Sequence, residues 1–276
     1  MKKVIVFVLA ILSMTMSGFA FKSMPSDTNK VNAEGEKEGL WKEKINEIEY
    51  LGKYINGKRE GLWIGEYPDG NDNRPRVWMD HHAGDLISNI DEYKNDKRNG
   101  LSITMDLKGY ISKKDYYVND TLDGVSIIYF PGAKLRSKTE YKMGKLNGIS
   151  STYYSADGRV KEEISYKNNI RDGASKWYYP KDILTLDNVK VSVEYQYKNG
   201  VLEGPQKTFY KSGNLESIVN SVNNLEEGEY HSYFENGKDK IIGKYVHGLK
   251  EGSWKEFDET GKIVKTEIYK NGELKK

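Results

Sequence analysis

Cysteine is absent from this chain of 276 residues, so a disulfide framework, a thiolate metal centre and a cysteine nucleophile are all excluded. Histidine occurs only four times, which leaves few metal ligands and few general bases. Hydrophobic residues make up only 37% of the chain against 30% charged residues, too few for one thick globular core. We therefore expect a thin layer in which tyrosine, tryptophan and aliphatic stems are partly buried.

Long apolar runs are also absent, except at the N-terminus. Lys2 and Lys3 form a basic start, residues 4–16 are mainly apolar, and Gly18 and Ala20 place small residues at −3 and −1 of a cleavage point. This pattern predicts a secretory signal peptide over residues 1–20, cleaved after Ala20, and hence a secreted or periplasmic protein of the cell envelope. The alternative is that the segment is retained as an N-terminal anchor.

An excess of charge of one sign is lacking as well. Loss of Lys2 and Lys3 with the signal peptide would leave 41 of the 43 basic residues against 41 acidic ones, a formal net charge of zero. That balance argues against nucleic acid as a partner and weakens any affinity for anionic lipid. Residues 21–34 are polar and predict a flexible linker.

The chain does contain a recurring glycine, in five of eight intervals 24 or 25 residues after the previous one. We call these residues the anchor glycines and count the positions of each repeat from them: Gly39, Gly61, Gly100, Gly124, Gly148, Gly173, Gly204, Gly228 and Gly252. A fixed period of this size is typical of small units stacked along one axis. Such arrays usually present surfaces, which argues against an enzyme.

Two turns are expected in each repeat. Position −4 always holds Gly, Asn or Asp, the residues that tolerate a positive φ: Gly35, Gly57, Asp96, Asp120, Gly144, Asn169, Gly200, Asn224 and Gly248. A second turn glycine usually follows about nine residues after the anchor. The remaining segments of roughly six or seven residues suit strands. The fold class expected is therefore all-β, an elongated single-layer antiparallel sheet of about nine tandem β-hairpin repeats over residues 35–276.

Aromatic residues follow the same period. Tyrosine recurs at −7, and Trp41, Trp63 and Trp254 stand at +2. If positions −5 to the anchor form the turn, the tyrosine faces the tryptophan across the hairpin, and such pairs stabilise a sheet by roughly 0.2–1 kcal/mol each. We interpret the tyrosines mainly as structural. The alternative is a ligand-binding aromatic face, for which the candidate residues are Tyr117, Tyr141 and Tyr166.

The interval between Gly61 and Gly100 contains about fifteen extra residues, near residues 71–85. Insertions into repeats form loops, often on a functional face. The candidate binding residues there are therefore Arg76, Trp78, His81 and His82. The alternative is a longer hairpin or a degenerate extra repeat.

Motifs for catalysis are missing from the sequence. Asp69 to Asn73 begins like a calcium loop, but Arg74 occupies the position where glycine is required. His81 and His82 are adjacent, so in a strand they point to opposite faces and do not share a metal. Carboxylates such as Glu226 and Glu227 recur with the repeat, which indicates a solvated face. We predict no catalytic residues, no metal site and no cofactor.

The phrase Tyr-x-Asn-Gly-x-x-x-Gly-x-Trp, followed by an aromatic residue and a glycine turn, resembles the MORN repeat. It is closest to the bacterial variant found in YwqK-family antitoxin proteins. The clearest copies are residues 54–70, 141–158, 197–213 and 245–261. The resemblance implies a scaffold or a surface that binds proteins or phospholipids, and the antitoxin label implies neutralisation of a partner protein.

We therefore expect a non-enzymatic secreted or periplasmic repeat protein whose sheet binds a protein partner. The alternatives are an antitoxin or immunity-like neutraliser and a binder of membrane surfaces. The sequence does not define the oligomeric state.

The signal peptide leads to the first testable prediction. The intact mass of the exported protein is expected to correspond to a chain that begins at Phe21, because Ala20 provides the small residue at the cleavage point. Mass spectrometry of the protein recovered from the envelope or the medium measures this directly. A mass that includes residues 1–20 would contradict it.

Overall fold

The computed structural model describes residues 28–67, 87–180 and 189–275, and all regular structure in these ranges is β-strand. The chain divides into two compact units, residues 1–121 and 122–276, which are described separately. The predicted signal peptide, the predicted insertion near residues 71–85 and most of the predicted linker lie outside the described residues.

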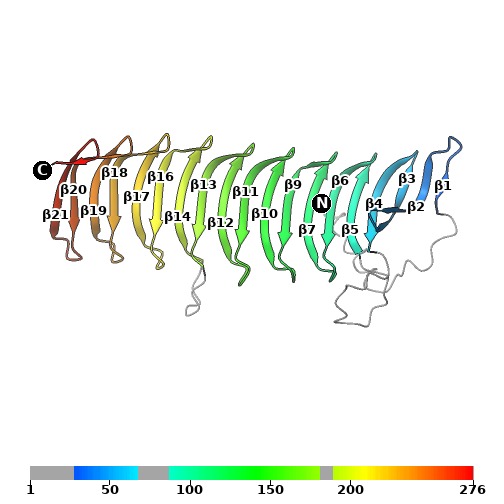
Figure 1. Cartoon of the computed structure of the whole chain (residues 1–276), viewed down its shortest axis with the longest axis horizontal. Helices are drawn as coiled ribbons and strands as arrows, with labels where there is room; N and C mark the ends of the chain where they lie inside the picture. The colour runs from blue at the N-terminus through cyan, green and yellow to red at the C-terminus, as the bar shows by residue number, and fades with distance from the viewer. Residues whose placement is uncertain (1–27, 68–86, 181–188, 276) are drawn as a thin grey trace. The chain divides into compact units, whose positions relative to one another are not determined.

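The first unit is an antiparallel sheet in which each strand pairs with the next one along the chain (Figure 1). Its strands are β1 (Lys30–Val31), β2 (Lys37–Ile45), β3 (Ile48–Ile55), β4 (Lys58–Glu66), β5 (Ile87–Lys94), β6 (Lys97–Met105) and β7 (Ile111–Val118). The short β8 (Thr121–Leu122) lies at the division between the units. Because β1 pairs with β2, the linker expected over residues 21–34 is wrong at its C-terminal end, where the backbone joins the sheet.

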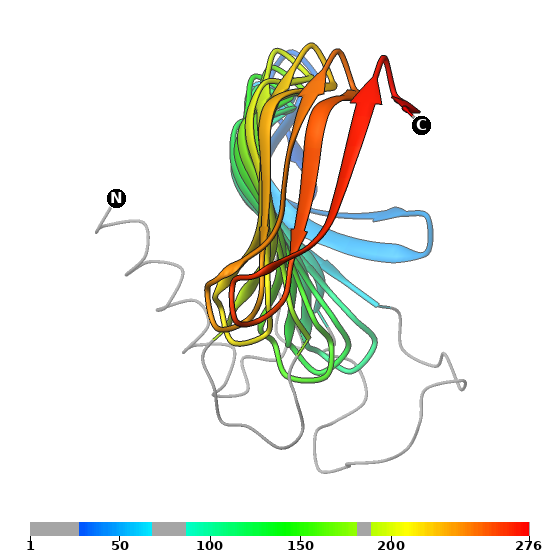
Figure 2. The same ribbon diagram turned by 90° about the vertical axis from the view of Figure 1, so that its left-hand side faces the viewer.

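The second unit is also a single antiparallel sheet, and its turns lie at the two ends of the strands (Figure 2). Its strands are β9 (Gly124–Tyr129), β10 (Leu135–Lys142), β11 (Lys145–Tyr153), β12 (Val160–Lys167), β13 (Ile170–Tyr178), β14 (Val191–Lys198), β15 (Val201–Leu202), β16 (Gly204–Phe209), β17 (Leu215–Val222), β18 (Leu225–Tyr233), β19 (Asp239–Val246), β20 (Leu249–Phe257), β21 (Ile263–Lys270) and β22 (Glu273–Leu274). The prediction of an all-β antiparallel array of tandem hairpins is confirmed.

The turn expected at position −4 is a two-residue turn in which both central residues have positive φ. Between β3 and β4 these residues are Asn56 at 48° and Gly57 at 70°, and the same pair of positive φ values precedes every later anchor glycine. Two positive φ angles define a type I′ turn, whose twist matches that of the strands it joins. The restriction to Gly, Asn and Asp at −4 follows from this geometry.

The anchor glycine itself is not the end of the turn, as we had expected. All nine anchors have positive φ, between 71° and 132°, and lie within strands at a local shift of register. They are therefore β-bulge positions, where glycine avoids the steric cost that a Cβ would carry. Because the turn has only two residues, Tyr54 lies opposite Arg59, although its ring still contacts Trp63 edge-on at 5.1 Å.

Each turn is hydrogen-bonded to the turn of the preceding repeat. The backbone N–H at −4 donates to the carbonyl at −2 of that repeat, as Gly57 does to Lys37 at 3.0 Å and Asn169 to Leu146 at 2.9 Å. The side chain at −1 then accepts the N–H of the following turn residue at −5. Glu251 accepts from Asn271 at 2.7 Å.

These bonds change our interpretation of the recurring carboxylates. We expected them to lie on a solvated face, but Glu227, which follows Glu226 in the sequence, accepts the backbone N–H of His247 at 2.8 Å. An unpaired backbone N–H is costly, and a charged acceptor makes a strong hydrogen bond to it. The acidic residue at −1 is thus part of the contact between repeats.

Tyrosine hydroxyls make a second series of contacts at the opposite ends of the strands in the second unit. Tyr154 donates to the carbonyl of Tyr178 at 2.9 Å, and Tyr210 donates to that of Tyr233 at 2.6 Å. Each bond runs from position +6 of one repeat to position +5 of the next. Neighbouring repeats are therefore joined at both ends of the hairpins.

The residue at +2 lies over the residue at −9 in the same hairpin, and their sizes compensate. A Cβ added to Gly243 would overlap the indole of Trp254, and one added to Gly52 would overlap Trp63. Where the residue at −9 is larger, +2 becomes small: Ile164 faces Ser175, which is fully buried. The backbone spacing is thus kept constant while the residues change.

This packing predicts that Gly243→Ala destabilises the second unit by about 1–3 kcal/mol, because the methyl group and the indole of Trp254 compete for one volume. Thermal unfolding followed by circular dichroism measures the loss. The control is the double variant Gly243→Ile/Trp254→Ser, which copies the pair Ile164 and Ser175. The size argument is wrong if the double variant unfolds at a lower temperature than Gly243→Ala.

Candidate interaction surface

Aromatic rings line one face of the sheet in each unit, and we call this side the aromatic face. It carries the side chains at −9, −7, −2, +2 and +4. In the first unit Trp41, Tyr54, Trp63 and Tyr93 form a continuous series of edge-to-face contacts, with ring centroids 5.8, 5.1 and 6.3 Å apart. Trp63 is only 1% exposed, so the centre of this series is core and not an open platform.

The second unit has a similar group near its C-terminal end. The indole of Trp254 lies edge-on to Tyr245 at 5.0 Å and to Tyr269 at 6.3 Å, and it stacks on Tyr230 at 5.5 Å. Such ring pairs contribute about 0.5–1.5 kcal/mol beyond the area they bury. These rings therefore hold the last repeats of the described chain together.

A cation at −2 lies over the rings in five repeats, a feature that the sequence analysis missed. Lys250 Nζ is 4.3 Å from the ring centroid of Trp254 and 4.9 Å from that of Tyr269 in the next repeat. Arg59 lies in the same way 4.8 Å from Trp63. Cation–π contacts of this kind stabilise by about 0.5–1 kcal/mol at exposed sites. The recurrence of Lys or Arg two residues before the anchor was the available signal.

The strongest polar cluster on this face surrounds Glu43 in the first unit. Its carboxylate is 2.8 Å from Lys37 Nζ and 2.6 Å from an Arg59 nitrogen, and it accepts the Tyr54 hydroxyl at 3.2 Å. Burial acts to raise the pKa of Glu43, but the hydrogen bonds from Lys37 and Arg59 outweigh it and the pKa is lowered. The carboxylate is therefore ionised and engaged with two strands other than its own.

A second acidic group lies further along the aromatic face of the first unit. Asp115 is 4% exposed, its Oδ2 is 2.6 Å from Lys113 Nζ, and it accepts the Tyr117 hydroxyl at 3.3 Å. Burial, followed by the charge of Asp115, raises the pKa of Tyr117. Asp91 accepts the Ser102 hydroxyl at 2.6 Å. These groups bind one another and do not converge on a common point.

The three candidate tyrosines occupy equivalent positions in successive repeats and are half-buried. Each lies directly opposite the anchor glycine of the preceding strand: Tyr117 opposite Gly100, Tyr141 opposite Gly124 and Tyr166 opposite Gly148. Arg98 also covers the Tyr117 ring, with Cζ 3.9 Å from the ring centroid. Their positions serve the contacts between repeats. The other candidates, Arg76, Trp78, His81 and His82, lie outside the described residues and stay predictions.

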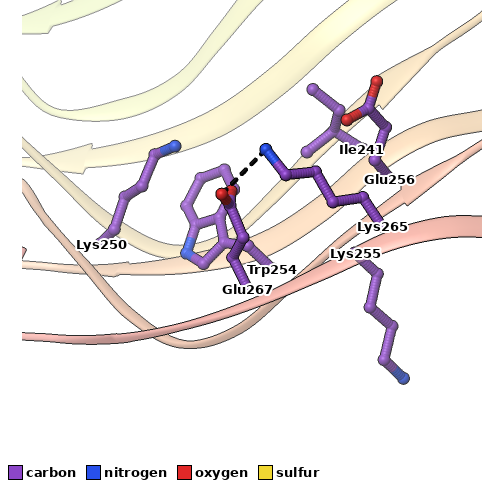
Figure 3. A pocket seen from close by; sticks show the side chains of 7 residues that line it. All are labelled: Ile241, Lys250, Trp254, Lys255, Glu256, Lys265 and Glu267. Carbon is purple, nitrogen blue, oxygen red and sulfur yellow. Dashed lines mark ion pairs between the residues drawn. The ribbon is translucent and has the colours of Figure 1, made fainter. Parts of the chain in front are cut away.

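A shallow hollow on the aromatic face adjoins Trp254. Figure 3 shows the Lys265 ammonium reaching the Glu267 carboxylate beside the indole, at 2.8 Å, while Lys255 points away from the hollow. Ile241 and Glu256 complete its lining. Its charged groups pair with each other, so the hollow offers no isolated acid, base or nucleophile.

Two searches restricted to the described residues bear on other functions. No group of three or more His, Asp or Glu side chains there is placed to hold a metal ion. The same ranges contain no helix with the length and apolarity needed to span a membrane.

The model of the MORN repeat variant family matches residues 148–168, 202–223 and 250–271. The first match covers β11 and β12, the second β16 and β17, and the third β20 and β21, so each corresponds to two strands that begin at or just before an anchor glycine. No curated protein gives a significant match to the sequence.

The chain is a MORN-repeat-variant protein. Repeats of this family are generally modules that bind proteins or membrane lipids, and the family is generally non-catalytic. The positions that define the repeat in this structure, the turn at −4, the anchor glycine and the tyrosine at −7, are all used to join hairpins.

The Glu43 cluster leads to a pH-dependent prediction. The folded-state pKa lies below the ordinary value of 4.5, so the ionised carboxylate stabilises the fold above that pH and this stabilisation is lost as the pH falls through the lowered pKa. At pH 7, Glu43→Gln is therefore expected to lower the unfolding temperature by about 2–4 °C, the shift that roughly 1 kcal/mol produces in a chain of this size. The difference should shrink towards pH 3.

The matched control is Glu47→Gln, because Glu47 is 81% exposed and pairs only with Lys44 at the surface. This variant should unfold with the wild type at both pH values. A constant difference between Glu43→Gln and the wild type from pH 7 to pH 3 would contradict a charge effect.

Proposed function

We propose that this chain is an exported, non-enzymatic interaction protein of the cell envelope, whose sheet binds another protein. The observation that carries the proposal is the use of the conserved elements of the repeat for internal contacts. Asp and Glu at −1, tyrosine at −7 and cations at −2 bind the neighbouring repeat. The remaining side chains differ from repeat to repeat and face outward.

Such an array suits recognition better than catalysis. The polar side chains are spread along the sheet at the period of the repeat, whereas acid–base or nucleophilic chemistry requires groups that converge within hydrogen-bonding distance of one substrate. A regular backbone with variable outward residues provides a rigid surface, and binding to a rigid surface carries a smaller ordering cost. The family's general role as a binding module supports the same conclusion.

Export rests on the sequence of residues 1–20 alone. An envelope location would place the partner there too. If that partner is a toxic effector, the role becomes that of an immunity protein. A membrane surface is the competing partner.

The proposal predicts that the chain without residues 1–20, immobilised and exposed to an envelope extract of its own organism, retains at least one protein that a heat-unfolded sample does not retain. Mass spectrometry identifies that protein, and titration of the purified protein against the chain then measures direct binding. Retention of no protein, together with flotation of the chain on anionic vesicles, would replace the proposed function with membrane binding.

A further inference from the structure

The two-residue turns of the second unit form a continuous row, because each donates a hydrogen bond to the turn before it. We call the side chains at −6, −5 and −3 beside these turns the turn edge. It has two sections of different chemistry. The basic section contains Lys142, Lys145, Lys167 and Lys198, and the apolar section contains Val222, Leu225, Val246 and Leu249.

The basic section has no partner for its charge within the described residues, where no ion pair involves any of these four lysines. Asp123 and Asp172 lie at the same edge, but each accepts a backbone N–H of the next turn, at 3.4 and 3.1 Å. A hollow opens between two turns of this section and is lined by Lys142, Met143, Lys145, Asn147, Lys167 and Asn168. Its donors and positive charges suit carboxylates.

The apolar section is held rigidly yet remains exposed. Leu225 and Leu249 are 46% and 49% exposed. Each rests against the glycine of the following turn, with Leu225 Cδ2 3.4 Å from where a Gly248 Cβ would lie, and Leu249 Cδ2 3.3 Å from the same point at Gly272. A fixed aliphatic side chain loses little freedom on binding, which favours its use as an anchor.

We propose that the turn edge of the second unit binds an extended acidic segment of a partner protein. Carboxylates of that segment lie along the basic section, and its aliphatic side chains lie along the apolar section. The inference rests on the proposed function, because it takes the partner to be a protein. Five successive turns span about 38 Å at about 9.6 Å per repeat, which an extended segment of about 12 residues covers.

The observations favour a peptide over a lipid surface for two reasons. The cations and the aliphatic side chains occupy separate stretches of the edge, which matches a segment with an acidic half and an aliphatic half. Residues that insert into the membrane interface usually include Trp, Tyr or Phe. In the described turns of the second unit, positions −6 to −3 contain none of these.

The test uses a labelled 12-residue peptide with four glutamates among serines in one half and leucine and valine in the other. A second peptide of the same composition has its glutamates and aliphatic residues intermixed. Fluorescence polarisation against the full exported chain is expected to show tighter binding of the first peptide. The quadruple variant Lys142→Glu/Lys145→Glu/Lys167→Glu/Lys198→Glu should weaken it by about tenfold or more.

The matched control reverses four lysines on strand faces of the same unit, Lys161→Glu/Lys207→Glu/Lys244→Glu/Lys255→Glu, and should retain most of the affinity. None of these four has an ion pair within the described residues. The double variant Leu225→Thr/Leu249→Thr tests the apolar section with β-forming residues of lower hydrophobicity and should also weaken binding. Circular dichroism verifies that every variant is folded.

Three results would overturn the inference. They are equal binding of the two peptides, equal losses in the edge and control lysine variants, and unchanged affinity in both edge variants. Vesicles with 30% anionic lipid provide a fourth, because flotation that depends on the edge lysines while the peptide does not bind assigns the edge to membranes. A protein captured from the extract equally by the wild type and the lysine edge variant would refute this inference while leaving the proposed function intact.

Discussion

The hydrogen bond between successive two-residue turns is the constraint on which the rest of the structure depends. With both central residues at positive φ, the N–H at −4 points along the sheet to the preceding turn and not back into its own hairpin. This bond fixes the register of the next hairpin. The acid at −1 then reaches the next N–H, the cation at −2 covers the next tyrosine, and that tyrosine lies opposite the anchor glycine. Stability therefore arises between nearest neighbours.

A constant backbone permits variation at the positions that lie between these contacts. The pair at −9 and +2 illustrates the principle, since Gly243 with Trp254 and Ile164 with Ser175 fill similar space with different shapes. The aromatic face is consequently an internal part of each unit, where rings and charges satisfy one another. The turn edge differs, because its lysines and leucines are not required by any neighbouring repeat.

Much of the fold follows from the sequence because few residues tolerate a positive φ. Gly, Asn and Asp at −4 located every type I′ turn after the first anchor. The anchor glycine was harder to interpret, since glycine permits a turn and a bulge equally, and only strand register distinguishes them. The acids at −1 looked solvated because a sequence does not show which backbone N–H groups lack partners. The cooccurrence of glycine at −9 with tryptophan at +2, in Gly52 with Trp63, was a signal that we did not use.

The two ends of the hairpins obey different rules. The type I′ turns that follow the first anchor all have two residues, whereas the connections at the other end vary: β4 ends at Glu66 and β5 begins at Ile87, and β13 ends at Tyr178 and β14 begins at Val191. At that end the links between repeats, such as Tyr154 to Tyr178, come from side chains and therefore do not fix loop length. The long-connection end is accordingly where evolution or an engineer gains new sequence without disturbing the sheet, so each hairpin is a ready attachment point for grafted loops.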